Sequence, residues 1–276
     1  LMNRFKLYFM NLYFYTFFIL FSIMVIPALT LFVAFLAIFI PHRYAMKRFR
    51  RAISWYGRVM TFIPFPLIKI HYEDHSKNNS LGCPHSGGFV ASGDSPRRAE
   101  ENESYRPEPY IFVSNHKSSS DPFLMCVLPH EAIQIVNVWP FNIPVLGIYA
   151  RLAGYLNVNK MPSGLFFDKA LKLLQEKVSI IFFPEGTRSG GKEMGNFHGS
   201  AFRLALQAQA AIVPICISGN ENIPPKGSLL LRPGTIRVRR LPSILWDDYK
   251  DMNVFSLKNR VREIISRELS LMENGI

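Results

Sequence analysis

The sequence predicts an α/β protein with a central mixed, largely buried sheet flanked by helices, and with an N-terminal helical membrane anchor. Three observations support this fold class. Residues 7–41 carry no charged side chain, residues 110–276 alternate between strand-like and helix-like segments, and polar motifs directly follow two of the strands. Such alternation is typical of domains in which helices cover the faces of a buried sheet.

The first 42 residues form the predicted anchor. The 35 uncharged residues from Leu7 to Pro41 would make a helix of about 50 Å, whereas the hydrocarbon core of a bilayer is ~30 Å thick. Pro27 divides this stretch into segments of 20 and 14 residues, so we expect either a kinked span or a two-helix hairpin that dips into one leaflet. The stretch is too long for a cleaved signal peptide and has no clear small-x-small cleavage site.

The net charge of +12 is concentrated beside the anchor, because residues 1–60 contain eight Lys or Arg and no Asp or Glu. We expect residues 43–72 to form a basic interfacial helix followed by the first strand. A basic collar next to an apolar segment favours the cytoplasmic side and an anionic lipid surface; the alternative is an ordinary solvated helix face. No nucleic-acid recognition motif accompanies the charge, so no nucleic-acid partner is expected. The collar comprises Arg43, Lys47, Arg48, Arg50, Arg51 and Arg58.

Composition changes sharply over residues 73–109, which contain six Ser, four Gly and four Pro. A structureless stretch of this length inside a compact domain is unusual, so we expect a mobile insertion. His75, Cys83 and His85 lie near or within it, but their spacing matches no standard zinc pattern, and no metal site is predicted. The three cysteines of the chain are irregularly spaced, which fits a reducing compartment.

Residues 110–276 form the predicted α/β domain. A first strand precedes it at residues 67–72, where apolar and polar residues alternate. A C-terminal amphipathic helix is predicted from the spacing of apolar residues between Leu257 and Leu269. The other predicted strands are residues 110–114, 133–138, 155–158, 178–183, 211–218 and 235–240, and the other predicted helices are residues 122–128, 144–153, 163–176 and 200–209.

A polar run with the sequence SNHKSSSDP, residues 114–122, directly follows the strand at residues 110–114. The carboxyl end of a buried strand is where α/β proteins place catalytic groups. The offset of five residues lets Asp121 accept a hydrogen bond from one imidazole nitrogen of His116 and leaves the other nitrogen as a base. Without a dedicated Ser or Cys nucleophile, such a pair suggests activation of a substrate hydroxyl. The alternative is that Asp121 only caps a helix and His116 is an ordinary loop residue.

A second motif, FFPEGTRSGG at residues 182–191, also follows a buried strand. It places the guanidinium of Arg188 at the lip of the sheet, and the donors of a guanidinium match phosphate oxygens. The alternative is a surface turn with a structural ion pair between Glu185 and Arg188.

Together the motifs resemble those of the lysophosphatidate acyltransferase family (1-acyl-sn-glycerol-3-phosphate acyltransferases) within the glycerolipid acyltransferase superfamily. Residues 115–121 resemble its NHX4D motif and residues 183–189 its FPEGTRS block. Residues 143–160 and 212–215 resemble its second and fourth blocks. The blocks occur in family order, and the resemblance covers roughly residues 43–72 and 110–245.

The resemblance implies a role for each matching residue. His116 would deprotonate the acceptor hydroxyl, and Asp121 would orient His116 and stabilise its imidazolium. Arg188 and the three residues before it would bind the acceptor phosphate, Lys160 would assist them, and Pro214 would lie beside the acyl chain. The whole substrate-binding set implied by the resemblance comprises Asn115, Lys160, Glu185, Gly186, Thr187, Arg188 and Pro214.

The implied reaction moves a fatty acyl group from acyl-CoA or acyl-carrier protein to the sn-2 hydroxyl of 1-acyl-glycerol 3-phosphate, which gives phosphatidic acid for phospholipid biosynthesis. A thioester is already activated, so no cofactor or metal is expected. The alternatives are another acceptor (glycerol 3-phosphate, a lyso-ornithine lipid or another lysophospholipid) and a catalytically silent, membrane-anchored lipid-binding protein. The catalytic domain is expected on the cytoplasmic face of a membrane. The chain departs from the family pattern in the insertion and at residues 197–200, where FHGS stands in place of Phe-Lys-x-Gly.

Overall fold

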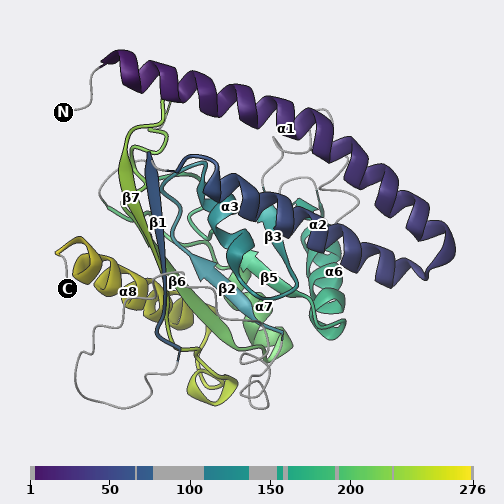
Figure 1. The fold of residues 1–276 in the computed structure, drawn as a ribbon. Coiled ribbons are helices and arrows are strands. Elements are labelled where there is room, and N and C mark those ends of the chain that lie inside the picture. The colour runs from purple at the N-terminus through teal and green to yellow at the C-terminus, as the bar shows by residue number, and fades with distance from the viewer. Residues whose placement is uncertain are drawn as a thin grey trace.

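The computed structural model describes residues 4–65, 67–76, 109–136, 154–157, 161–189, 193–225 and 227–274. Two helices, α1 (Arg4–Phe39) and α2 (His42–Phe62), precede a domain built on a seven-stranded sheet. The strand order is β1-β7-β6-β2-β5-β3-β4. All neighbours pair in parallel except β6 and β7, which are antiparallel, so the mixed α/β fold predicted from the sequence is confirmed (Figure 1).

The strands agree with the predicted segments to within a few residues. They are β1 (Ile68–Asp74), β2 (Ile111–Ser114), β3 (Ala132–Val136), β4 (Leu156–Asn157), β5 (Ser179–Phe182), β6 (Ile212–Ser218) and β7 (Gly234–Arg240). The helices of the domain are α3 (Asp121–Leu124), the 3-10 turn η3 (Met125–Val127), α6 (Ser163–Gln175), α7 (Ser200–Ala208), the 3-10 turn η4 (Trp246–Asp248) and α8 (Val254–Glu273). Most of the predicted insertion (residues 77–108) and the predicted helix at residues 144–153 lie outside the described residues.

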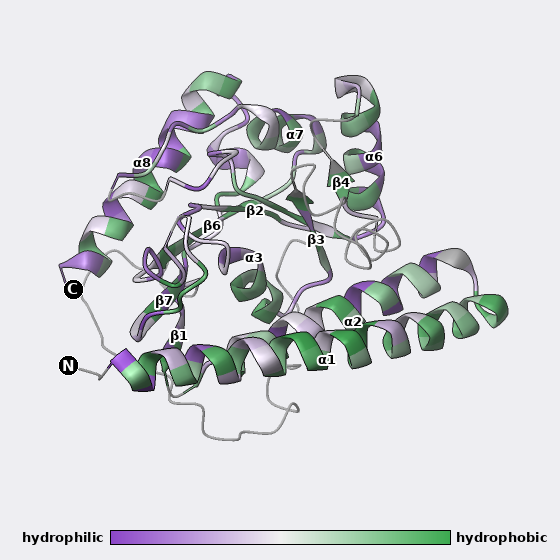
Figure 2. Cartoon of the chain, turned by 90° about the horizontal axis from the view of Figure 1, so that it is seen from above, coloured by the Kyte–Doolittle hydropathy of each residue, from purple (hydrophilic) through white to green (hydrophobic). Residues whose placement is uncertain are grey.

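The sheet is buried between two apolar layers because successive side chains of a strand point to opposite faces. In β2, Ile111 and Val113 pack into the core that α6, α7 and α8 cover, whereas Phe112 packs into the core on the other side. That second core includes Leu124 and Met125 from α3 and η3, and Met10 of α1 lies against it. Figure 2 shows the sheet with α6, α7 and α8 on one side and α3, α1 and α2 on the other.

Helix α1 is uninterrupted, with Pro27 inside it. The alternative of two helices divided at Pro27 is therefore wrong. A helical hairpin is present, but it consists of the whole of α1 and the following helix α2, which pack side by side (Figure 2). Among the described residues α1 is the one helix long and apolar enough to cross a membrane, and only 6% of its most apolar window is buried.

The amino-terminal part of α1 is nevertheless fixed to the domain. The Asn11 side chain is buried and forms a pair of hydrogen bonds with the backbone of Leu231, at 2.9 Å from Nδ2 to O and 2.7 Å from N to Oδ1. The Tyr15 hydroxyl donates to the carbonyl of Leu229. Further along α1, the hydroxyl of Ser22 lies 2.6 Å from that of Tyr56 in α2. Helix α1 thus lies along the domain rather than pointing away from it.

Part of the basic collar also serves to fix α2 to the domain. Arg50 is buried and pairs with Glu131 at 2.7 Å, and Lys47 lies 3.5 Å from the same carboxylate. Arg58 donates to the carbonyls of Cys126 and Leu128 at 3.0 and 3.3 Å. Arg50 therefore forms an ion pair inside the protein, and the expected contact of the collar with an anionic lipid surface stays a prediction for its other members.

Candidate active site

The site begins at the carboxyl end of β2, near the centre of the sheet. After Ser114 the chain turns sharply, so that the N–H groups of Lys117 and Ser118 point at the side chain of Asp121, at 2.8 and 2.9 Å from Oδ2. Asp121 is the first residue of α3. Its carboxylate turns back into the preceding loop rather than forward into the helix, so its role is not merely that of a helix cap.

The same carboxylate holds the imidazole of His116. Nδ1 of His116 lies 2.7 Å from Oδ2 of Asp121. With the proton on Nδ1, the lone pair of His116 lies on Nε2, which is the arrangement that a general base requires. The His116 side chain is 18% exposed and its ring lies 4.7 Å from that of Phe183, centroid to centroid. The structure thus brings together the two predicted catalytic residues.

Asp121 itself is completely buried. Burial raises the pKa of Asp121 above its ordinary value, and the hydrogen bond from His116 acts against that rise. Its second oxygen, Oδ1, accepts a hydrogen bond from the side chain of Asn220, which is also fully buried. The carboxylate therefore has four donors around it, three on Oδ2 and one on Oδ1, which fixes its orientation toward the imidazole.

Glu185 holds the catalytic loop through the backbone of His116. Its Oε1 accepts from the N–H of His116 at 2.7 Å, and its Oε2 accepts from the N–H of Gly195 at 2.8 Å. Burial raises the pKa of Glu185, and these two donors oppose the rise. Both carboxylate oxygens are thus engaged inside the protein, so the expected contact of Glu185 with the substrate phosphate is corrected to a positioning role.

The Arg188 segment is tied to the same histidine. Ser189 donates to the carbonyl of His116 twice, from its N–H at 2.9 Å and from its hydroxyl at 3.2 Å. Arg188 is half-buried, whereas Gly186 and Thr187 are exposed. Gly186 adopts φ +71°, and a Cβ on it would lie 3.1 Å from the ring of His198. The predicted phosphate-binding segment therefore lies beside the His116–Asp121 pair.

Two further residues, neither of them predicted from the sequence, complete this edge of the sheet. Asn220 follows the carboxyl end of β6, which pairs in parallel with β2, so it reaches the same edge as His116. Lys117 is buried, and its Nζ lies 2.8 Å from Glu221 and 2.9 Å from Glu273. A polar residue directly after a buried strand was the available signal for Asn220; nothing local distinguishes Lys117.

The Lys117 cluster links the catalytic loop to the end of α8. Burial acts to lower the pKa of Lys117, but the hydrogen bonds that its ammonium group donates to Glu221 and Glu273 outweigh this effect, so the pKa is raised. The loop is also fixed on its other side, because the hydroxyls of Ser118 and Ser120 donate to the carbonyl of Ile223 at 2.8 and 3.0 Å.

Three other members of the predicted substrate-binding set are Asn115, Pro214 and Lys160. Asn115 is fully buried, and its side-chain amide exchanges two hydrogen bonds of 2.8 Å with the backbone of Ile217. Its predicted substrate contact is wrong, because the amide joins β6 to the loop after β2. Pro214 is buried inside β6 opposite Val113, and its role beside an acyl chain stays a prediction. Lys160 lies outside the described residues.

The segment that contains His116 and Arg188 resembles known proteins in sequence. The family model described as Acyltransferase matches residues 97–218. The chain is 34% identical over 179 residues to the 1-acyl-sn-glycerol-3-phosphate acyltransferase alpha of Ovis aries, with 61% of each chain covered. It is 27% identical over 223 residues to the 1-acyl-sn-glycerol-3-phosphate acyltransferase of Limnanthes alba, with 79% of this chain and 77% of the relative covered. The chain thus spans about three fifths of the length of the mammalian relative.

The fold is shared with a solved structure. The crystal structure of the 1-acyl-sn-glycerophosphate (LPA) acyltransferase PlsC from Thermotoga maritima aligns with a TM-score of 0.72 over 99% of this chain and 98% of that one, at 19% identity. The likeness extends over the helix pair as well as the sheet, because almost the whole chain is covered. The NHX4D and FPEGTRS segments, which the structure holds together around His116, both lie within residues 97–218, the part of the chain that matches the Acyltransferase family model.

Proposed function

We propose that this chain transfers a fatty acyl group from acyl-CoA or acyl-carrier protein to the sn-2 hydroxyl of 1-acyl-glycerol 3-phosphate, and so makes phosphatidic acid for phospholipid biosynthesis. The observation that carries the proposal is the His116–Asp121 pair, with Nδ1 held at 2.7 Å by a buried carboxylate. The names of the relatives support the choice of acceptor, because both act on 1-acyl-glycerol 3-phosphate.

The proposed reaction begins with His116. Nε2 takes the proton of the acceptor hydroxyl as its oxygen attacks the carbonyl carbon of the thioester, and Asp121 stabilises the imidazolium that forms. The tetrahedral intermediate then collapses, the C–S bond breaks, and the leaving thiolate receives the proton from His116. General-base assistance of this kind contributes about 10²–10⁴-fold. The thioester supplies the activation, so we expect no cofactor or metal in this step.

Arg188 is the proposed partner of the acceptor phosphate. Its neighbour Ser189 is bound to the carbonyl of His116, which keeps the Arg188 segment beside the catalytic histidine. An acceptor whose phosphate is bound by Arg188 could therefore present its hydroxyl to His116. Lys160 and Pro214 remain proposed contacts of the phosphate and the acyl chain.

We place the helix pair in the membrane and the catalytic domain at its cytoplasmic surface. Helix α1 has 36 residues, which corresponds to about 54 Å, and its exposed side chains are mostly large and apolar. Because Asn11 and Ser22 both fix α1 along the domain and α2, insertion into one leaflet fits better than an upright span. The acceptor would then reach the site from the bilayer and the soluble donor from the water.

The test is product analysis by mass spectrometry, with the full chain purified in a neutral detergent. The acceptors are 1-acyl-glycerol 3-phosphate, glycerol 3-phosphate, a lyso-ornithine lipid and lysophosphatidylcholine, each with acyl-CoA and with acyl-carrier protein. We expect phosphatidic acid, and less than a few per cent of it with His116→Ala. His71→Ala, which removes an exposed histidine from β1, is the matched control and should retain full activity.

Faster acylation of another acceptor would overturn the proposed substrate while leaving the chemistry intact. No product from any acceptor, with a folded protein, would favour the catalytically silent lipid-binding alternative.

A further inference from the structure

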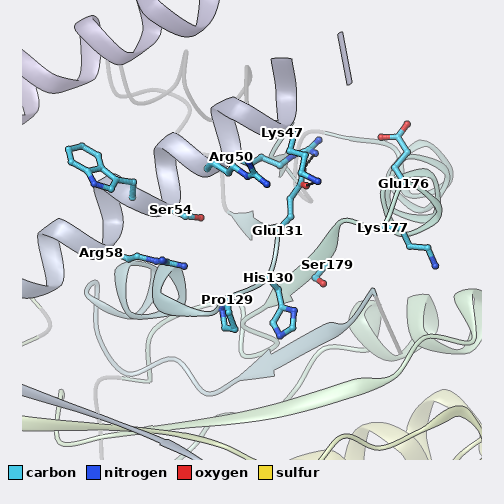
Figure 3. Close-up of a pocket in the computed structure, with 12 residues that line it drawn as sticks. Lys47, Arg50, Ser54, Arg58, Pro129, His130, Glu131, Glu176, Lys177 and Ser179 are labelled. Carbon is cyan, nitrogen blue, oxygen red and sulfur yellow. Dashed lines mark hydrogen bonds and ion pairs between the residues drawn. The ribbon is translucent and has the colours of Figure 1, made fainter. Parts of the chain in front are cut away.

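The edge of the sheet opposite His116 is also hollowed. A cavity of about 560 Å³ opens between α2 and the segments that lead into β3 and β5. We call it the basic pocket. Its volume is within the range of about 300–1,000 Å³ that is typical of small-ligand sites. It is lined by Lys47, Arg50, Arg51, Ser54, Trp55, Arg58, Pro129, His130, Glu131, Glu176, Lys177 and Ser179 (Figure 3).

The basic pocket is separate from the catalytic site. Strands β2, β3 and β5 are parallel, so their carboxyl ends, with His116 and Glu185, share one edge of the sheet and their amino ends share the other. Ser179, which lines the pocket, is the first residue of β5, whereas Glu185 follows its last residue. Four strand residues at about 3.3 Å each separate the two edges by more than ~10 Å.

The charge of the pocket suits an anion. Five of its side chains are cationic and two are carboxylates. Glu131 is already paired with Lys47 and Arg50, and Figure 3 shows these three side chains together on one wall of the pocket. Arg58 donates to two carbonyls, and it has no carboxylate partner among the residues that the structure describes. Arg51 is exposed, and within the described part of the chain it has no ion pair.

The surroundings of the pocket indicate where its anion comes from. One wall is α2, and Trp55 of that wall is 49% exposed and lies 6.1 Å from Phe21 of α1, centroid to centroid. The rim therefore continues into the apolar surface of the helix pair. A ligand with an anionic head and an apolar tail matches both features, because the pocket lining itself offers little apolar surface for a chain.

We propose that the basic pocket binds the phosphate-bearing headgroup of an anionic phospholipid whose acyl chains lie against α1 and α2. This site is distinct from the site where the acceptor reacts, and it fixes the orientation of the domain at the membrane surface. The proposal does not depend on the reaction assigned to His116, because binding is measured without turnover.

The test uses the full chain in neutral-detergent micelles and isothermal titration calorimetry. The probes are dihexanoyl phosphatidylglycerol, dihexanoyl phosphatidylcholine, inorganic phosphate and coenzyme A. The pocket variant is Arg51→Gln with Lys177→Gln, at two exposed side chains of the lining. The matched control is Arg48→Gln with Lys172→Gln, which removes the same charge from exposed positions of α2 and α6 outside the lining.

We expect saturable binding of phosphatidylglycerol that the pocket variant weakens at least about tenfold and the control less than about twofold. Phosphatidylcholine should bind much more weakly, and added salt should weaken phosphatidylglycerol binding because it screens the charges. Equal binding by parent and pocket variant, or equal binding of the two lipids, would overturn the proposal. If inorganic phosphate or coenzyme A bound as tightly as phosphatidylglycerol, with the same loss in the pocket variant, the lipid occupant would be wrong.

Discussion

The charge of Asp121 can be separated from its hydrogen bonds by one substitution, Asp121→Asn. Its Oδ2 accepts from His116 Nδ1 and from the N–H groups of Lys117 and Ser118. An amide oxygen can still face these three donors. The amide NH₂ would then face Asn220, whose own Oδ1 can turn toward it, since that atom is buried and without a hydrogen bond in the described structure. The substitution should therefore preserve the loop and remove the negative charge.

The expected loss of activity follows from the charge alone. Two unit charges about 4 Å apart interact by roughly 4 kcal/mol at an effective dielectric constant of about 20. Since Asp121 is fully buried, solvent screens this interaction little, and most of it acts on the imidazolium that forms during the reaction. At 1.36 kcal/mol for each factor of ten, we expect kcat to fall by about 10²–10³-fold.

The assay is the steady-state rate of acyl transfer under saturating donor and acceptor, with circular dichroism and thermal unfolding to verify the fold. Asn220→Ala is the comparison variant, because it removes a hydrogen bond to Asp121 Oδ1 and leaves the charge; kcat should fall less than about tenfold. A folded Asp121→Asn protein with kcat within a few-fold of the parent would refute the electrostatic role. An equal loss in Asn220→Ala would show that orientation, rather than charge, is what matters.

Three further predictions concern the loops around the site. Arg188→Ala should raise the KM for the acceptor at least about tenfold and change kcat less; an unchanged KM in steady-state kinetics would remove its proposed phosphate contact. Lys117→Met should lower the free energy of unfolding by about 2 kcal/mol, because it leaves two carboxylates beside a buried site without their cation. Glu273→Gln changes a side chain that is 49% exposed and should cost less than about 1 kcal/mol. Equal effects of the two substitutions in thermal unfolding would contradict this. Burial raises the pKa of Glu185 from an unfolded value near 4.5, so the folded protein binds this proton more tightly than the unfolded chain does. The parent should therefore lose stability as pH rises above about 4.5, whereas Glu185→Gln has no such proton to lose. The stability of Glu185→Gln relative to the parent should rise over this range by ~1.4 kcal/mol per unit of raised pKa. A pH-independent difference between the two unfolding curves would refute that reasoning.

The sheet could be predicted from the sequence because buried parallel strands are short apolar runs whose length and β-branched content differ from those of helices. Strand β6, Ile212–Ser218, is buried at every position, and its sequence IVPICIS shows this directly. The continuous helix across Pro27 could not be predicted in the same way. Proline removes one backbone hydrogen bond and disfavours a helix, but whether the helix continues depends on the packing of its neighbours.

The site was predictable where its partners are close in sequence and unpredictable where they are not. The contact of His116 with Asp121 spans five residues and follows from loop geometry, whereas Asn220 reaches Asp121 across 99 residues. Glu185 was expected at the substrate phosphate because it lies in the segment that resembles the FPEGTRS block. The structure instead directs both of its oxygens to backbone N–H groups, and a sequence does not show which way a side chain turns.

The basic collar also shows that a sequence does not reveal which way each side chain points. Lys47, Arg51, Ser54 and Arg58 recur every three or four residues, so they occupy one face of α2, and that face lines the basic pocket. Phe49 and Met60 are buried apolar residues on another side of α2. A count of positive charges therefore predicts that a helix meets an anionic surface, but the helical period decides which charges can do so. Arg50 forms a buried ion pair with Glu131. The other cations of this face, Lys47, Arg51 and Arg58, line the basic pocket where the domain meets the apolar helix pair, which is where a lipid headgroup would lie.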